Sequence, residues 1–151
     1  MNLIKRLYRL LITAASSLQS PFLLAVRLYW GWQFHTTGMG KLHDLGKVTD
    51  FFTSLGIPAP GPTAVFIATL EFVGGLLLIL GLGSRLVALL MTGNMLVAFF
   101  AADREALFSI FSDPDKLYAA TPYTFLFASL IILFFGPGKL SIDALLAKRW
   151  K

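Results

Sequence analysis

The sequence contains no cysteine in its 151 residues. A chain without thiols can form no disulfide and no thiolate metal site, and it offers neither a CxxC redox pair nor a cysteine nucleophile. If this protein takes part in redox chemistry, its electrons therefore do not pass through a thiol of its own.

Charged residues are also scarce, at 14% of the chain against roughly 25% in a typical soluble protein. Hydrophobic residues make up 56%, and the mean hydropathy is +0.73. A water-soluble fold of this size needs far more polar surface. The net charge of +5 comes from bases scattered between apolar spans, without the basic cluster and interleaved aromatics of a nucleic-acid interface. We therefore expect contact with a lipid bilayer and no nucleic-acid partner.

The sequence does contain four apolar stretches that approach the roughly 20 residues a helix needs to cross a bilayer. They cover residues 21–40, 62–82, 84–102 and 119–136. This pattern predicts an all-α fold, an integral membrane four-helix bundle over residues 21–138.

Local signals predict where several helices begin and end. Ser84 is expected to cap the third span after the tight turn GLGS, and Thr121 to cap the fourth, with Pro122 in its first turn. In the loop between the first two spans, Thr49 and Gly56 bound a short predicted helix. The phenylalanines of this helix are expected to lie in the headgroup layer or to dip back into the membrane.

Two amphipathic surface helices are expected to flank the bundle. Residues 1–20 have leucines at helical spacing beside three basic residues, and their apolar run is too short for a signal peptide. We interpret them as an N-terminal interfacial helix. Residues 139–151 form a basic C-terminal tail, in which a helix over 141–150 begins at the cap Ser141.

The distribution of Lys and Arg predicts the orientation in a plasma membrane. One side of the predicted bundle carries eight, namely Lys5, Arg6, Arg9, Arg85, Lys139, Lys148, Arg149 and Lys151. The other side carries four, namely Lys41, Lys47, Arg104 and Lys116. The excess places both termini in the cytoplasm.

A carboxylate interrupts the second span, in TAVFIATLEFVGGLLLILG, residues 63–81. At 1.5 Å per residue, Glu71 lies about 16 Å from the cytoplasmic end of its helix, and Asn94 and Gly31 lie about 15 Å deep in theirs. An acid, an amide and a small residue thus share one layer near the midplane.

The first span carries a polar and small-residue stripe that faces the bundle interior, because charge that faces lipid is unfavourable. Its members are Arg27, Gly31, Phe34, His35, Gly38 and Lys41. We expect Glu71 to pair with Arg27 or His35, or to stay unpaired and protonated. Gly75, on the face of Glu71, would let another helix approach closely. The polar layer is then either interhelical glue or a site for a ligand or proton.

The segments RLYWGWQFHTTGMGKL, DFFTSLGIPAP, LEFVGGLLLILGLGSRLVALL and FGPGKLSIDALL together resemble the DoxX family of small membrane proteins. The resemblance spans about residues 21–146. It implies a four-helix membrane bundle and a link to membrane redox systems, since the family is named after a subunit of quinol-oxidase and thiosulfate:quinone oxidoreductase systems. The residues it implies as shared are Arg27, Gly31, Gly38, Lys41, Glu71, Gly74, Gly75 and Arg85.

We therefore expect a quinone-interacting subunit of a membrane redox complex, working with a partner redox protein or as a homo-oligomer. A quinone needs flat walls and hydrogen-bond donors. Glu71 and His35 are the candidate catalytic residues, since either could move a proton. The candidate ligand-binding residues are Arg27, Gly31, Phe34, Lys41 and Asn94.

Other sites and functions are less well supported by the sequence. His35 and His43 are eight residues apart, with His43 in a loop, so neither a haem nor another metal site is expected. The alternative function is a non-catalytic membrane scaffold or assembly factor for a partner oxidoreductase. A transporter is a third class, but a single polar layer gives no continuous route.

Overall fold

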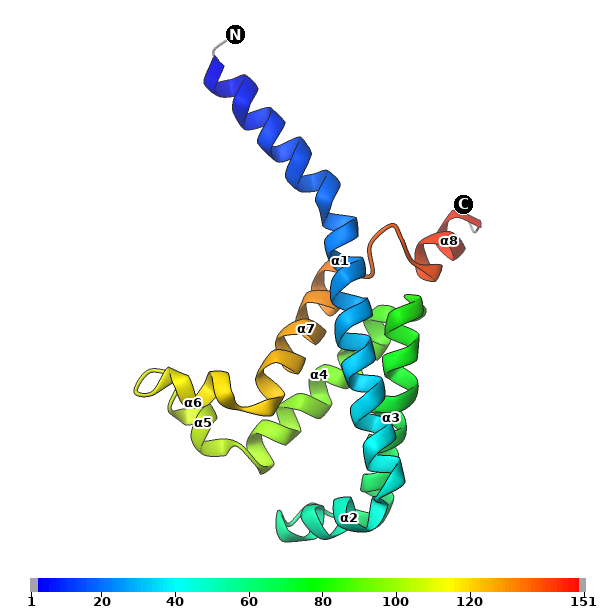
Figure 1. Cartoon of the computed structure of the whole chain (residues 1–151), viewed down its shortest axis with the longest axis vertical. Coiled ribbons are helices and arrows are strands. Elements are labelled where there is room, and N and C mark those ends of the chain that lie inside the picture. The colour runs from blue at the N-terminus through cyan, green and yellow to red at the C-terminus, as the bar shows by residue number, and fades with distance from the viewer. Residues whose placement is uncertain (1–2, 150–151) are drawn as a thin grey trace.

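The computed structural model describes residues 3–149, and the regular structure in that part of the chain is entirely α-helical (Figure 1). Its helices are α1 (Leu3–His43), α2 (Leu45–Ser54), α3 (Pro60–Leu80), α4 (Ser84–Ala101), α5 (Arg104–Phe108), α6 (Pro114–Ala119), α7 (Thr121–Phe135) and α8 (Ile142–Arg149). The predicted all-α membrane fold is confirmed. Within residues 3–149, three helices, α1, α3 and α4, are long and apolar enough to cross a membrane. At about 22 Å, α7 is shorter than a typical hydrocarbon core of roughly 30 Å, so a fourth span stays a prediction.

The long helices are arranged as two pairs. Helix α1 packs along α3, and α4 packs along α7, while α2 crosses the end of the first pair (Figure 1). Helix α3 ends and α4 begins at one tight turn, and the two helices diverge with distance from that turn (Figure 1). Most of the packing between the pairs comes from a core that includes Phe34, Leu78, Met91 and Ile132.

Glycines allow α1 and α3 to touch along their backbones. A Cβ added to Gly75 would come within 2.5 Å of Gly31 O and of His35 N, and one added to Gly38 would overlap the backbone of α3 at Phe72. No side chain fits at such distances. The predicted close approach of a helix at Gly75 is therefore confirmed, and the approaching helix is α1.

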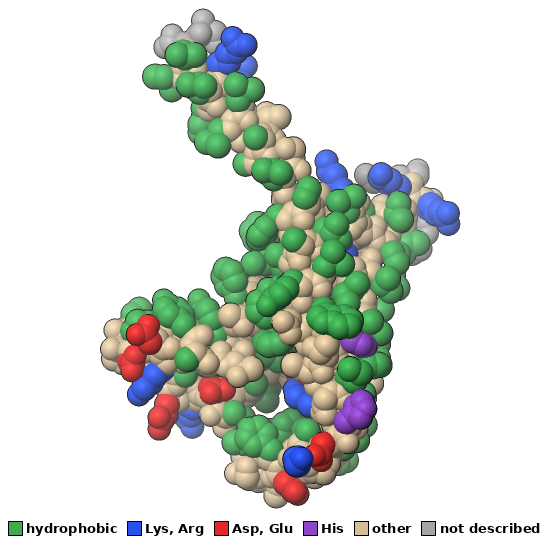
Figure 2. All heavy atoms as spheres, in the orientation of Figure 1, with side chains coloured by type: hydrophobic (Ala, Val, Ile, Leu, Met, Phe, Trp, Pro, Cys, Tyr) green, Lys and Arg blue, Asp and Glu red, His purple; other side chains and the backbone are tan. Residues whose placement is uncertain are grey.

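The outer faces of the helices are apolar. Only a third of the most apolar window of α3 is buried by protein, and large side chains such as Phe66, Leu86 and Phe134 are more than half exposed. Figure 2 shows hydrophobic side chains along the whole length of the visible face. This is the surface of a protein that contacts lipid, since a soluble protein rarely exposes such continuous apolar area.

Helix α1 differs from its predicted boundaries because it runs unbroken through Pro21. The Ser20–Pro21 pair is a typical helix start. Here, however, Ser20 Oγ accepts a hydrogen bond from Lys139 N (3.1 Å) and does not cap a new helix. Residues 3–20 therefore continue α1 away from the bundle, at an angle to the part of the helix that packs on α3 (Figure 1). Residues 1–2 of the predicted surface helix lie outside the described part.

The predicted caps met different outcomes. Pro122 lies in the first turn of α7 and Gly56 is left-handed (φ +70°), as expected, but Thr121 does not cap α7, because Ala120 holds that position. The prediction that Thr49 begins α2 is wrong, since Asp44 caps that helix by accepting from Lys47 N (3.2 Å).

Ser84 does not cap α4 either, because a carboxylate from the C-terminal segment does so. Asp143 accepts hydrogen bonds from Gly83 N (2.7 Å) and Ser84 N (2.9 Å). The cap of α8 is the predicted one, as Ser141 Oγ accepts from Ala144 N (3.2 Å). The C-terminal segment is thus attached to the turn between α3 and α4.

Charge is segregated along the molecule. The acidic side chains near α2, α5 and α6 lie at the opposite end from the basic side chains of the N-terminal segment and α8 (Figure 2). The described part of the chain therefore has a basic end and an acidic end, and the assignment of the basic end to the cytoplasm stays a prediction.

Candidate functional site

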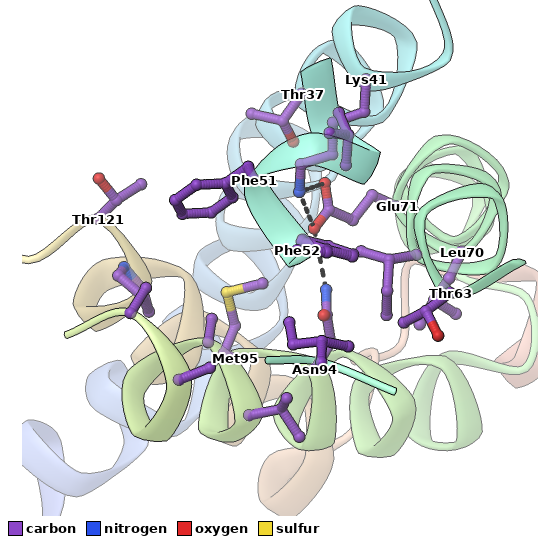
Figure 3. Close-up of a pocket in the computed structure, with 18 of the residues that line it drawn as sticks. Thr37, Lys41, Phe51, Phe52, Thr63, Leu70, Glu71, Asn94, Met95 and Thr121 are labelled. Carbon is purple, nitrogen blue, oxygen red and sulfur yellow. Dashed lines mark hydrogen bonds and ion pairs between the residues drawn. The ribbon is translucent and has the colours of Figure 1, made fainter. Parts of the chain in front are cut away.

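Glu71 is the centre of a three-residue polar cluster (Figure 3). Lys41 Nζ lies 2.6 Å from both Oε1 and Oε2 of Glu71, and Asn94 Nδ2 donates to Oε1 at 2.9 Å. The three side chains come from α1, α3 and α4, so the cluster ties together helices from both pairs. The contact between Asn94 and Glu71 confirms that these residues share one layer of the bundle.

Neither predicted partner of Glu71 pairs with it. Arg27 is fully buried at the other end of the bundle, where Nη1 donates to Leu78 O (3.4 Å) and Nη2 donates to Leu140 O. An Arg27–Glu71 ion pair is therefore wrong. Side chains lean toward the N-terminus of their helix, which carries the Glu71 carboxylate toward the Lys41 end of α1 and away from Arg27.

His35 lies beside α3 but on a different side of it from Glu71. Its Nδ1 is 3.1 Å from Phe72 O, and its ring centroid is 4.4 Å from that of Phe72. A contact between His35 and Glu71 is thus also wrong, because consecutive residues of a helix point about 100° apart and His35 meets Phe72. Lys41 belonged to the predicted stripe, and its long side chain reaches back to the carboxylate.

The cluster borders a cavity of about 750 Å³. Glu71 is 2% exposed and Lys41 33% exposed, so the acid is enclosed while the ammonium group borders open space. Apolar side chains from five helices make the walls, among them Phe34, Phe51 and Phe52. Helix α2 therefore closes one end of the cavity with the two phenylalanines that the sequence placed in or near the membrane (Figure 3).

Four of the seven predicted site residues line this cavity, namely Phe34, Lys41, Glu71 and Asn94. The other three do not line the cavity: Arg27 and His35 bind backbone carbonyls, and Gly31 lies in the contact with α3. Sequence reasoning missed the contribution of α2, although its phenylalanine pair on a short loop helix was the available signal.

The cluster offers both donors and an acceptor to a ligand. A lysine ammonium has three N–H groups, and at most two of them point to the carboxylate oxygens, which leaves one for the cavity. The carboxylate can accept a proton, and its neighbours then lose an ionic partner. Such a paired acid in an apolar enclosure is typical of sites that bind polar groups or transfer protons.

Comparison with known proteins identifies the family. The sequence model of the family described as DoxX matches residues 22–104, more than half of the chain. The chain belongs to the DoxX family. The matched DoxX region contains the whole Lys41–Glu71–Asn94 cluster, while Leu140 and Asp143 lie beyond it.

Two relatives share much of the DoxX chain. It is 29% identical to "Inner membrane protein YqjF" of Escherichia coli (strain K12) over 134 residues, which cover 88% of this chain and 98% of that protein. It is 30% identical to "Putative oxidoreductase CatD" of Bacillus subtilis (strain 168) over 98 residues, or 65% of this chain and 72% of the relative. No solved structure matches the chain.

Proposed function

We propose that this DoxX protein is a quinone-interacting subunit of a membrane redox complex, and that the cavity beside Glu71 holds the quinone ring. One observation carries the proposal: a buried, hydrogen-bonded carboxylate and its lysine border an apolar, aromatic-walled cavity inside a membrane bundle. A purely structural ion pair has no need of such a space.

The residues present fit a quinone. Ligand sites of small molecules measure roughly 300–1,000 Å³, are mostly apolar and hold a few convergent polar groups. This cavity has about 750 Å³, flat walls from Phe34, Phe51 and Phe52, and one polar cluster. Lys41 and Asn94 are donors within reach of a ring carbonyl, and both lie beside the same carboxylate oxygen of Glu71.

When bound, a quinone supplies the reversible uptake of two electrons and two protons. In the proposed site, Lys41 donates a hydrogen bond that orients a carbonyl oxygen, and Glu71 holds and releases a proton. Lys41 is 33% exposed against 2% for Glu71, so it is the more accessible member of the pair. The electrons come from a partner redox protein, since the chain has no thiol to carry them.

The relatives support the setting of the proposal. The printed name of one relative places it in an inner membrane, and the printed name of the other includes oxidoreductase. By analogy we place this chain in the plasma membrane, with its basic end and both termini in the cytoplasm. The cavity then lies near the opposite, outer face.

The test is the quinone content of the purified protein. The wild-type protein and the variants Glu71→Gln and Lys41→Met are purified in mild detergent and extracted with solvent, and quinone is quantified by chromatography and mass spectrometry. Loss of a hydrogen bond to a charged group weakens binding by roughly 10- to 100-fold, so both variants should lose their quinone.

The controls are Lys116→Met and His35→Gln, which remove a base and an imidazole away from the cavity. Both should keep the wild-type quinone content. Equal quinone in all five proteins would mean that the cluster is not the site. No quinone in any of them would favour the alternative, a membrane scaffold in which Glu71 only joins helices.

A further inference from the structure

The cavity continues beyond the bundle core to the surface that faces lipid. Among its exposed lining residues are large apolar side chains of two neighbouring helices, Phe66 by 59%, Leu90 by 44% and Val97 by 58%. Phe66 belongs to α3, and Leu90 and Val97 belong to α4. The cavity therefore opens sideways between these two helices, at the level of the membrane interior.

The opening follows from the side chains that α4 presents beside α3. Near their shared turn the two helices are in contact, because a Cβ on Gly74 would meet Val87 Cγ1 at 3.2 Å and overlap Met91. Gly93 of α4 lies on a side of the helix that has no such contact: a Cβ added there would meet nothing within 4 Å, although the next residue, Asn94, still binds Glu71 of α3. Gly93 is exposed, lines the cavity and precedes Asn94 of the polar cluster.

We infer that the ligand of this cavity is a quinone with a long hydrocarbon tail, and that the tail leaves the bundle between α3 and α4 past Gly93. The inference rests on the proposed function and adds the class of quinone and its route. The ring is fixed by the cluster at Lys41 and Glu71, and α2 covers the cavity with Phe51 and Phe52.

The sideways opening suits a tail because it faces hydrocarbon. A tail that passed the α2 end would enter the region of Asp44 and Lys47, which form an exposed ion pair (2.6 Å). A tail that passes Gly93 stays among Phe66, Leu90 and Val97 and then reaches lipid, so no apolar surface meets water. Gly93 thus acts as a specificity-determining residue, since any larger side chain there narrows the exit.

Gly93 also makes the inference testable without damage to the fold. Leucine at this helical position has room for its Cβ and is a better helix former than glycine. Gly40 provides the matched control, because it is an exposed glycine of α1 whose Cβ would also meet nothing within 4 Å, and it does not line the cavity. Gly93→Leu and Gly40→Leu should therefore fold equally well.

The experiment compares two probes in nanodiscs of fixed lipid content, with Glu71→Gln as the blank for partition into lipid. The probes are the tailless dimethoxy-methyl-benzoquinone and the same ring bearing a decyl tail. In Gly93→Leu we expect the affinity for the tailed probe to fall by about tenfold or more, because the tail loses buried methylenes. The affinity for the tailless probe should stay at the wild-type value, and Gly40→Leu should change neither.

Several results would overturn the inference while the proposed function stands. Unchanged affinity for both probes in Gly93→Leu would place the tail elsewhere, and equal loss of both would place the ring itself at Gly93. Extraction of a phospholipid together with a tailless quinone would show that an acyl chain fills the opening.

A different result would overturn the proposed function as well. If the wild-type protein binds neither probe above the blank, the proposed function fails and the inference fails with it.

Discussion

The two ends of this bundle each hold a charged group from α1, but one end buries it and the other leaves it partly exposed. At the basic end, Arg27 is fully enclosed and binds the backbone carbonyls of Leu78 and Leu140, next to the turn that Asp143 caps. At the acidic end, Lys41 binds Glu71 and borders an open cavity. A positive side chain of α1 thus binds backbone carbonyls of other segments at the basic end, and a second one remains accessible to a ligand at the acidic end.

The comparison teaches how to separate structural from functional charges in a membrane helix. Backbone carbonyls have fixed positions, so the guanidinium that binds them stabilises a packing arrangement and nothing else. Side-chain partners such as Glu71 and Asn94 can change protonation or rotamer. We therefore expect substitutions at the basic end to affect stability, and substitutions at the acidic end to affect ligand content.

The largest effect on stability should come from Arg27→Met. The substitution removes a buried charged donor that binds the carbonyls of Leu78 and Leu140, and a hydrogen bond to a charged group contributes about 1.5–3 kcal/mol. We expect a loss of about 3 kcal/mol or more, measured by unfolding in detergent. Arg104→Met, whose guanidinium lies over an exposed ring of α5, is the control, and a stable Arg27→Met protein would remove the distinction between the two ends.

Asp143→Ala should have the next largest effect, because it removes the cap that α8 supplies to α4. Loss of a helix cap costs about 0.5–2 kcal/mol. The expected loss of stability is in that range, with quinone content per folded protein unchanged. Asp50→Ala removes an exposed carboxylate of α2 and should leave stability at the wild-type value. If Asp143→Ala lost its quinone while stability was retained, the two ends would be coupled through function.

Glu71→Gln should have a smaller effect on stability, below about 1 kcal/mol, since side-chain hydrogen bonds between membrane helices are typically that weak. Glutamine keeps an acceptor for Asn94, and the freed ammonium group of Lys41 can turn to the open cavity. The same protein should nevertheless lose its quinone. A Glu71→Gln protein that unfolds like Arg27→Met would make the acidic end as structural as the basic end.

The smallest effect concerns Asp44, the cap of α2 at the acidic end. The hydrogen bond and ion pair with Lys47 hold the pKa of Asp44 below its usual value. A carboxyl whose pKa is lower in the folded state stabilises the fold above its unfolded pKa of about 3.9, and this contribution is lost as the pH falls through the folded pKa. Hydrogen exchange of α2, corrected for intrinsic rates, should therefore quicken at low pH.

Asp44→Ala serves as the control for that measurement. Its α2 should exchange faster than the wild-type helix already at neutral pH and show no further change near pH 4. Identical pH profiles in both proteins would assign the low-pH change to another group.

The sequence predicted the helices well but several of their partners poorly, and the reason is physical. Apolar runs depend on local composition, so the helices from Pro60 and from Ser84 appear at the expected positions. That Glu71 and Asn94 share one level of the bundle follows from helical rise, and their contact confirmed it. The cap of α4 comes from Asp143, about 60 positions along the chain, and no local pattern contains that information.

The misassigned partner of Glu71 has a similar cause. Depth along a helix is easy to count, but the tilt between α1 and α3 and the reach of a lysine side chain are not. The glycine contact at Gly31 and Gly75 sets how the two helices cross, and that crossing brings Lys41 to the carboxylate while His35 meets Phe72. The stripe on α1 was visible in the sequence, whereas its alignment with α3 depends on packing.

Helices α3 and α4 are joined at one tight turn, so the angle between them sets the distance between residues far from that turn. Glu71 lies ten residues before Gly81 and Asn94 ten residues after Ser84, so each is about 15 Å from the turn. At that distance, a change of about 4° in the angle between α3 and α4 displaces Asn94 relative to Glu71 by about 1 Å, which is enough to break the hydrogen bond between them. Arg27 and Asp143 stabilise the turn itself, whereas the hydrogen bond between Asn94 and Glu71 holds the two helices together about 15 Å away from it.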